Sequence, residues 1–476
     1  MRNPCLRFLL GSLGLFSVTI SCAAQSAPAQ ANLQAPASFQ GSVPSGAVSG
    51  EAISLSLDDA LQRGLRYNLG AINSQQSLRQ TRGQTIVARS ALLPNLNGDL
   101  RETVEQIDLA SFGFKFSVPP SLGFSFPNIV GPFNYFDLRG YLTQKLADVQ
   151  ALRTYQSVRE ERRAAELSVG DARELVVYVV TAGYLQVIAE AARVDSAKAQ
   201  VDSAQAIFQQ ASDRFNAGLS ARIDRTRSQV ELQTQQQRLT SEQASYGKQK
   251  IALARLVGLP SGQDYVLTDV IPYAPLENLT LEQAMDLAAH NRFDLKAAEA
   301  QMTAATLARK AAVAERYPTL NVAADYGVIG VNPAQSHGTF SVNGQLSFPI
   351  WAGGRARGDI EQADANLQHL RAVYDDLRAR VEADVRSAYL DLTAAAQQVG
   401  VSQSRRDLAR DELVQSRDRF ASGVADTVEV VQAQEAVASA EQDYIASLNA
   451  HNLAKASVAR AAGQAEKTMH DLLRSK

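Results

Sequence analysis

The feature that most constrains this chain is that its sequence contains one long unit twice. The segment SLDDALQRGLRYN, which begins at Ser56, recurs 224 residues later from Thr280 as TLEQAMDLAAHNR. Further along, RFNAGLSARID, which begins at Arg214, recurs 205 residues later as RFASGVADTVE. Any fold assigned to the first copy must therefore also suit the second. We expect two structural repeats, at residues 53–258 and 280–464.

Each copy carries a heptad pattern that predicts very long helices. In the first copy, positions seven residues apart hold mostly apolar side chains: Val180, Val187, Val194, Val201, Phe208 and Phe215. The equivalent positions of the second copy are Val385, Leu392, Val399, Arg406, Leu413 and Phe420. This spacing is typical of a coiled-coil seam, here followed by a tight turn and a return helix. No proline lies between residues 146 and 259, so the first outgoing helix, about 150–215, would be roughly 98 Å long.

Between the helices, each copy contains segments in which large and small side chains alternate. They predict two β-hairpins, at about 95–146 and 319–351, and hence four strands in all. Four amphipathic strands cannot close into a barrel, and lipid does not tolerate open strand edges. Either the hairpins belong to a soluble sheet, or several chains combine their strands. The first copy holds some 19 extra residues, which we place in a Gly-, Pro- and Phe-rich loop near 111–133.

The N-terminal residues have a pattern that is typical of an export signal. Two arginines precede an apolar run at residues 8–20, and small residues follow, so we assign residues 1–24 to a signal peptide. The run is too short to span a bilayer, and no later segment offers the roughly 20 continuous apolar residues of a membrane helix. Cys22 is either a lipid-anchor cysteine or part of a plain cleavage site.

The remaining segments connect or end the repeats. Residues 25–52 are rich in Ala, Pro, Ser, Gln and Gly, which predicts a flexible linker. Residues 259–279 form a linker between the repeats, and 465–476 form a C-terminal tail.

Composition argues against several classes of function. The net charge of −2 gives no basic field to hold nucleic acid. The five His are scattered without metal-ligand spacing, and both Cys lie within the first 22 residues. The segment GGRARG lacks the phosphate-loop order, and no serine sits in a G-x-S-x-G elbow. We therefore expect no enzyme, no metal and no cofactor.

These features together resemble the outer-membrane efflux proteins, the TolC-like channel-tunnels. The resemblance spans about residues 53–463 and rests on the duplicated helix–hairpin–helix–turn–helix order, the paired turns RFNAGLSARID and RFASGVADTVE, and the strand-exit segment FPIWAGGR. It implies a mainly α fold with a membrane β-barrel portion. In a homotrimer, the long coiled-coil helices would form an α-barrel tunnel in the periplasm, and four strands from each protomer would contribute to a 12-stranded outer-membrane barrel.

The resemblance also implies a function. The chain would be the channel-tunnel of a tripartite efflux or type I secretion system, a passive export duct from the periplasm to the exterior. Its partners would be a periplasmic adaptor, an inner-membrane pump and outer-membrane lipid. The alternative is a soluble periplasmic coiled-coil adaptor or scaffold protein, which would need no strands that face lipid.

Two turns are the candidate docking tips for the adaptor. They consist of Ala217, Gly218 and Leu219 in the first copy and of Ser422, Gly423 and Val424 in the second. A glycine permits the positive φ of a turn between antiparallel helices, and its apolar neighbour offers a partner something to bury. The alternative is that each is only a tight turn.

Asp224 and Glu429 lie just past these turns, at positions 205 residues apart. The resemblance implies that they ring the closed periplasmic entrance, where threefold symmetry would make a cation-selecting ring of carboxylates. In the family a Tyr and an Arg lock such an acid, but Phe420 and Ala425 occupy those sites here. Candidates for a substitute lock are Arg222, Arg225 and Asp426. The alternative is that each acid lies on a solvated helix face.

We predict that the loop near 111–133 is extracellular, because it lies at a hairpin tip and accounts for the main length difference between the copies. A cysteine introduced by Ser121→Cys should react with a membrane-impermeant thiol reagent on intact cells. A cysteine introduced by Ala217→Cys, at the expected periplasmic tip, should stay protected. Protection of the Ser121 position would contradict the assignment.

Overall fold

The structure is a computed structural model, and it describes residues 36–113, 127–269, 273 and 279–473. The signal peptide, Ser121 and part of the linker between the repeats lie outside the described residues. The contacts below belong to the compact unit that starts at Pro36.

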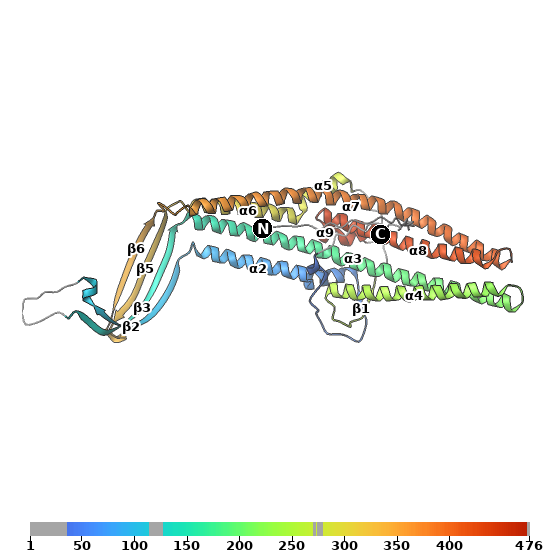
Figure 1. Ribbon diagram of the computed structural model, residues 1–476, viewed down its shortest axis with the longest axis horizontal. Helices are drawn as coiled ribbons and strands as arrows, with labels where there is room; N and C mark the ends of the chain where they lie inside the picture. The colour runs from blue at the N-terminus through green and yellow to red at the C-terminus, as the bar shows by residue number, and fades with distance from the viewer. Residues whose placement is uncertain (1–35, 114–126, 270–272, 274–278, 474–476) are drawn as a thin grey trace, which may run out of the picture. The chain divides into compact units, whose positions relative to one another are not determined.

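The two copies fold with the same order of elements (Figure 1). The first copy contains α1 (Leu57–Tyr67), α2 (Leu69–Ser90), β2 (Asn95–Asp108), β3 (Ile129–Ala147), α3 (Val149–Asn216) and α4 (Arg222–Val257). The second contains α5 (Leu281–Asn291), α6 (Phe293–Ala314), β5 (Thr319–Gly330), β6 (Ser336–Ser347), α7 (Arg355–Ala421) and α8 (Thr427–Ala461). Helices α3 and α7 have 68 and 67 residues, so each is roughly 100 Å long.

Equivalent signals start equivalent helices in the two copies. Ser56 and Asp59 form a capping box at the start of α1, and Thr280 and Gln283 form the matching box at the start of α5. Each box satisfies two backbone N–H groups that would otherwise lack a partner. The duplicated sequence thus starts its first helix in both repeats by the same local contact.

The heptad seam lies inside the helical bundle. Val180, Val187 and Val399 are completely buried, and Phe420 is nearly so. The polar station Arg406 packs its guanidinium over the Tyr444 ring at 4.0 Å. One apolar cluster joins the repeats, since side chains of α3 and α8 pack there with helix α9 (Ala465–Leu473).

The hairpins form one antiparallel sheet in the order β2-β3-β5-β6, so that β3 and β5 join the two copies. One face of this sheet is apolar and exposed in the single chain. It carries Leu96, Leu100, Val104, Leu138, Leu142, Tyr326, Phe340, Val342 and Leu346. Glu102 is an exception on this face and accepts a hydrogen bond from the Asn134 amide at 3.0 Å. The opposite face is polar. Figure 1 shows the sheet at one end of the helices.

Three connecting segments are more ordered than the sequence predicted. Part of the expected flexible linker contacts the first repeat, since the Phe39 ring lies against Gly70, which has no Cβ, and the Val43 N–H donates to the Tyr67 carbonyl at 2.9 Å. The linker between the repeats contributes β4 (Tyr265–Leu267), which pairs in parallel with β1 (Ile53–Leu55). The expected tail instead forms α9, whose Met469 is buried.

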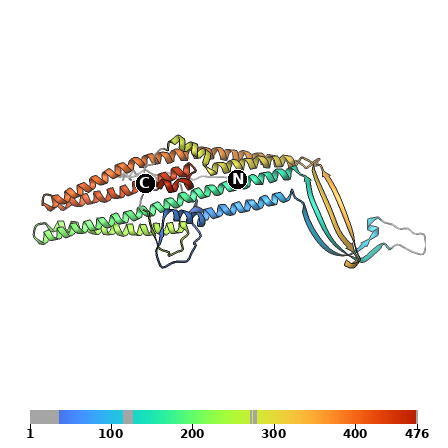
Figure 2. The ribbon, with the colours of Figure 1, turned by 180° about the vertical axis from the view of Figure 1, so that it is seen from behind.

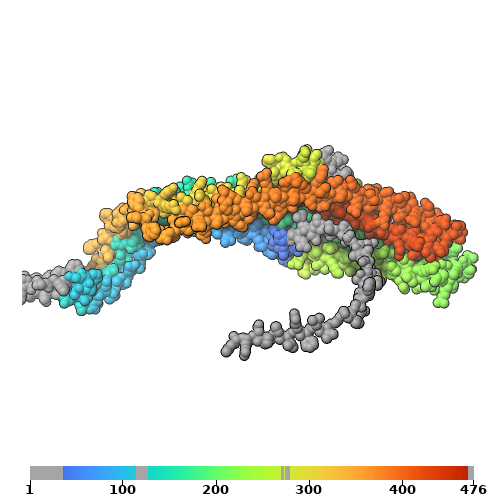
Figure 3. Space-filling model, turned by 45° about the horizontal axis from the view of Figure 1, so that its top comes forward, coloured from blue at the N-terminus to red at the C-terminus, as the bar shows by residue number. Residues whose placement is uncertain are grey.

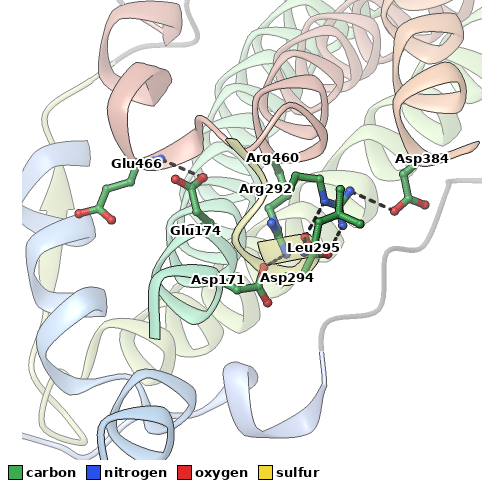
Figure 4. Close-up of polar contacts among 8 residues, drawn as sticks. All are labelled: Asp171, Glu174, Arg292, Asp294, Leu295, Asp384, Arg460 and Glu466. Carbon is green, nitrogen blue, oxygen red and sulfur yellow. Dashed lines mark hydrogen bonds and ion pairs between the residues drawn. The ribbon is translucent and has the colours of Figure 1, made fainter. Parts of the chain in front are cut away.

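A network of charged side chains holds α9 and the start of α6 to the long helices (Figure 4). Arg292, which is almost fully buried, pairs with Asp294 at 2.6 Å and with Asp384 at 3.4 Å. Arg460 on α8 pairs with Asp171 on α3 at 2.7 Å. Arg292 thus ties the start of α6 to α7 within the second repeat, and the Arg460–Asp171 pair joins this repeat to α3.

Two carboxyl groups of this network have pKa shifts of opposite sign. Burial opposes ionisation of Asp294, but the hydrogen bonds and charge of Arg292 outweigh it and lower the pKa of Asp294. Glu174 is only 2% exposed, and burial raises its pKa even though it accepts a backbone hydrogen bond from Glu466 at 3.3 Å. The ionised form is therefore stabilised at Asp294 and destabilised at Glu174.

We predict that Glu174→Gln stabilises the protein at neutral pH, since it removes a charge that folding has to bury. The raised pKa of Glu174 means that the native carboxyl gains a proton before the unfolded one as the pH falls. The advantage of the variant, measured as the difference in melting temperature in detergent, should therefore be larger at pH 7.5 than at pH 5.

Asp294→Asn is the matched control, with the opposite sign. The lowered pKa of Asp294 stabilises the fold above the unfolded-state value, so this variant should lose about 2 kcal/mol at pH 7.5. The loss should shrink as the pH falls through the native pKa. Equal effects of the two variants at both pH values would contradict the assignment of the shifts.

Candidate functional site

The two helix hairpins end in matching turns. Between α3 and α4, the Leu219 N–H donates to the Arg214 carbonyl at 2.8 Å. Between α7 and α8, the Val424 N–H donates to the Arg419 carbonyl at 3.0 Å. The same hydrogen bond therefore closes both turns, 205 residues apart. Figure 2, which shows the ribbon from behind, places both turns at the same end of the helices.

Both turns depend on a left-handed glycine. Gly218 has φ +74° and Gly423 has φ +78°. A Cβ at Gly218 would meet no atom within 4 Å, so the backbone angle and not lack of space requires glycine there. A residue with a side chain would strain the turn, although its neighbours leave room for it.

Each turn exposes one large apolar side chain. Leu219 is 72% exposed and Val424 is 70% exposed. Ala217 and Ser422 precede the glycines, where they end α3 and α7. In Figure 3 the two hairpin ends lie beside each other on the surface. The structure thus brings all six predicted tip residues to one end of the described unit, with two apolar side chains facing solvent.

The two predicted acids lie in equivalent places but have different surroundings. Asp224 is in the first turn of α4, and Glu429 is in the first turn of α8, where the helix dipole favours a negative charge. Glu429 pairs with Arg419 at 2.9 Å. Among the described residues, the structure shows no ion pair for Asp224. The two carboxylates are therefore not equally free to attract cations.

Two arginines, which the sequence analysis did not single out, explain this difference. Arg214 and Arg419 occupy the same position of the repeat. Arg419 binds the acid of its own hairpin, whereas Arg214 lies 4.9 Å from the centre of the Phe420 ring and donates a hydrogen bond to the Phe420 carbonyl. The paired RF dipeptides at the two turns were the signal that could have identified both arginines.

Arg214 therefore joins the two hairpins of one chain. Of the suggested substitute locks, Asp426 caps α8 by accepting from the Val428 N–H at 3.1 Å, and Arg225 lies 5.6 Å from the Phe215 ring of its own hairpin. Neither contact reaches the other hairpin. Phe420, which stands where the family has a polar lock partner, is instead the surface that Arg214 covers.

The described residues offer little for metal chemistry or for a membrane helix. No group of three or more His, Cys, Asp or Glu among them could hold a metal ion. Within the same residues, one helix, α3, has a stretch long and apolar enough to cross a membrane, and 61% of that stretch is buried within the chain. This burial suits the core helix of a bundle.

Two long helix hairpins with matching tips, joined to a sheet with one apolar face, define the class of outer-membrane channel proteins with a periplasmic helical tunnel. Residues 284–464 match the family model described as outer membrane efflux protein. The second repeat of this chain is thus similar to that family.

Two relatives in Pseudomonas aeruginosa are similar to more of the chain. The pyoverdine export outer membrane protein OpmQ is 23% identical over 394 residues, which cover 81% of this chain and 80% of that protein. The alkaline protease secretion protein AprF is 25% identical over 315 residues, or 63% of each.

Solved structures share the fold. The outer membrane protein VceC from Vibrio cholerae superposes with a TM-score of 0.72 at 18% identity, covering 86% of this chain and 96% of that one. The Campylobacter jejuni CmeC outer membrane channel superposes with a TM-score of 0.74 at 15% identity, covering 90% of this chain and 94% of that one.

Proposed function

We propose that the chain is the outer-membrane channel-tunnel of a tripartite efflux or type I secretion system. Three copies would pool their sheets into one 12-stranded barrel, and their long helices would form the periplasmic tunnel. The observation that carries this proposal is the sheet itself, because its apolar face is exposed and its edge strands β2 and β6 lack a second neighbour within the described chain. Closure with further copies satisfies both edges, and lipid covers the apolar face.

The alternative, a soluble periplasmic adaptor or scaffold, fits this sheet poorly. Phe340 is 76% exposed and Leu96 is 75% exposed on the same face. A soluble sheet would turn such residues toward a core or a partner. The apolar face therefore favours the channel.

The relatives are named for cargo of very different kinds, since one is named for pyoverdine export and another for secretion of an alkaline protease. We infer that the duct is passive and that the inner-membrane pump and the adaptor select the cargo. Such a duct needs no catalytic residue, metal or cofactor.

The tips would dock the periplasmic adaptor. Ala217, Gly218 and Leu219 and their counterparts Ser422, Gly423 and Val424 present two rigid turns with one exposed apolar side chain each. An apolar side chain on a preformed turn can bury itself in a partner at little entropic cost. This supports docking over a role as turns alone.

Beside the tips, Asp224 and Glu429 would ring the entrance. Because Arg419 pairs with Glu429, Asp224 would be the less neutralised of these two acids. Three copies would bring three Asp224 carboxylates together, and multivalent cations would bind between them. Arg214 would hold the two hairpins of each chain together in place of the usual lock.

We predict that the purified protein forms trimers in the outer-membrane fraction and conducts ions in planar bilayers, with block by divalent or trivalent cations from the periplasmic side. Asp224→Ala should weaken this block more than Glu429→Ala, because Glu429 is paired within its chain. A stable monomer recovered from the periplasm without detergent would overturn the channel. If cations block the wild type and the Asp224→Ala, Glu429→Ala double variant equally, neither acid lines the entrance.

We predict that a charge at the tips abolishes export without unfolding the channel. Leu219→Asp with Val424→Asp would place carboxylates where an adaptor must bury apolar surface, at a cost of a few kcal/mol, or about a hundredfold in affinity. Crosslinking to the adaptor and export should both fall, while trimer migration and conductance stay normal. The matched control is Ile251→Asp, an equally exposed site on α4 far from the turn. Undiminished crosslinking of the tip variant would refute docking there.

A further inference from the structure

The polar face of the sheet carries a cluster of charges that the proposed export function does not require. The cluster consists of Asp99 and Arg101 on β2, Asp137 and Arg139 on β3, and Asp325 on β5. Asp99 lies directly opposite Arg139, and Arg101 lies directly opposite Asp137. Opposite charges therefore face each other across neighbouring strands.

Arg139 is the centre of this cluster. Its Nε lies 3.3 Å from an Asp137 oxygen, its Nη1 is ion-paired with Asp325, and its Nη2 donates to the Thr339 hydroxyl at 2.8 Å. Only a guanidinium offers donors in a planar fork that can serve two carboxylates and a hydroxyl at once. Arg139 thus connects β3 with both strands of the second hairpin.

The centre of the cluster is shielded, whereas Asp99 and Arg101 on β2 are exposed. The side chains of Arg139, Asp325 and Asp137 are 14%, 16% and 20% exposed. Asp325 also accepts a hydrogen bond from Ser341 on β6. These contacts hold the side chains of Arg139, Asp137 and Asp325 in one arrangement. Fixed charges of this kind present a constant electric field to ions that pass them.

The two faces of the sheet decide where these charges point. In an outer-membrane barrel the apolar face meets lipid and the alternate residues face the interior. Since Leu138 and Leu142 belong to the apolar face, their alternating neighbours Asp137, Arg139 and Tyr141 face inward. The charges therefore belong to the barrel wall along which cargo and ions would pass.

We propose that this cluster is a charge-selecting girdle inside the barrel, in which Arg139 sets the ion selectivity by offsetting part of the negative charge of Asp137 and Asp325. The inference rests on the proposed channel function. Three aspartates and two arginines give the girdle a formal charge of −1 per chain. Without Arg139 that charge doubles, and two neighbouring carboxylates lose their partner. Ions passing within about 8 Å, the screening length at physiological salt, would sense the change.

The test is the reversal potential of single channels in a KCl gradient. The measurement is made on the full chain with Asp224→Ala and Glu429→Ala, so that the acids at the tips contribute nothing. Arg139→Gln should raise the preference for K⁺ over Cl⁻ severalfold, and Asp325→Asn should shift it toward Cl⁻. Trimer migration on gels shows whether each variant has assembled.

Two controls separate selectivity from bracing of the strands. Arg139→Lys keeps the positive charge and should retain the parental reversal potential. Thr339→Val removes a hydrogen bond to Arg139 without changing charge and should also leave the potential unchanged. If Arg139 only braced the strands, its substitutions would impair assembly, and every variant channel that did assemble would have the same reversal potential.

Each outcome decides a different question. If the Arg139→Gln and Asp325→Asn channels conduct ions with the parental reversal potential, the girdle proposal is wrong and the proposed channel function is unaffected. If Arg139→Gln does not assemble, the direction of the Asp325→Asn shift decides. Absence of any conductance in the unmodified protein refutes the proposed channel function itself, and the girdle with it.

Discussion

The whole structure depends on finding hydrogen-bond partners for the backbone N–H and C=O groups along the two edges of the β2-β3-β5-β6 sheet. Strands β2 and β6 each pair on one side within the described chain, and the apolar face between them is exposed. In lipid, unpaired N–H and C=O groups cost several kcal/mol each, so the sheet is stable there only when its edges are closed. In the proposed assembly, further copies of the chain close these edges, and the long helices α3 and α7 continue from the sheet into the tunnel.

The two repeats share a sequence pattern but use it differently. Gly258 and Gly463 end the return helices α4 and α8 with similar positive φ angles. In the first repeat Ser42, Val43 and Tyr67 lie against Gly258, whereas in the second Arg292 lies against Gly463. Likewise Arg419 pairs with an acid, and its counterpart Arg214 covers Phe420. Duplication supplied a common frame, and the contacts between the copies made them different.

Much of the fold could be predicted because it is local. The heptad stations that include Val180 and Val399 predicted buried seams, and the glycines of both turns predicted left-handed residues, as the structure shows. The packed segment around Phe39 and helix α9 could not be predicted. Phe39 is held by residues distant in sequence, because Gly70 leaves room for its ring and the Asn68 amide donates a hydrogen bond to its carbonyl. Helix α9 is held by Glu174 on α3.

The sequence by itself determined the repeat, the periodicity of its helices and strands, and the positions of the tips and of Asp224 and Glu429, because these depend on residue spacing along one chain. Only the tertiary structure decided which charges are free. Arg214 packs on Phe420 of the other hairpin, whereas Arg419 pairs with Glu429 of its own hairpin. Arg139 pairs with Asp137 on its own strand and with Asp325 on the neighbouring strand. Electrostatic energy depends on distances between side chains, and folding alone sets those distances for residues far apart in sequence.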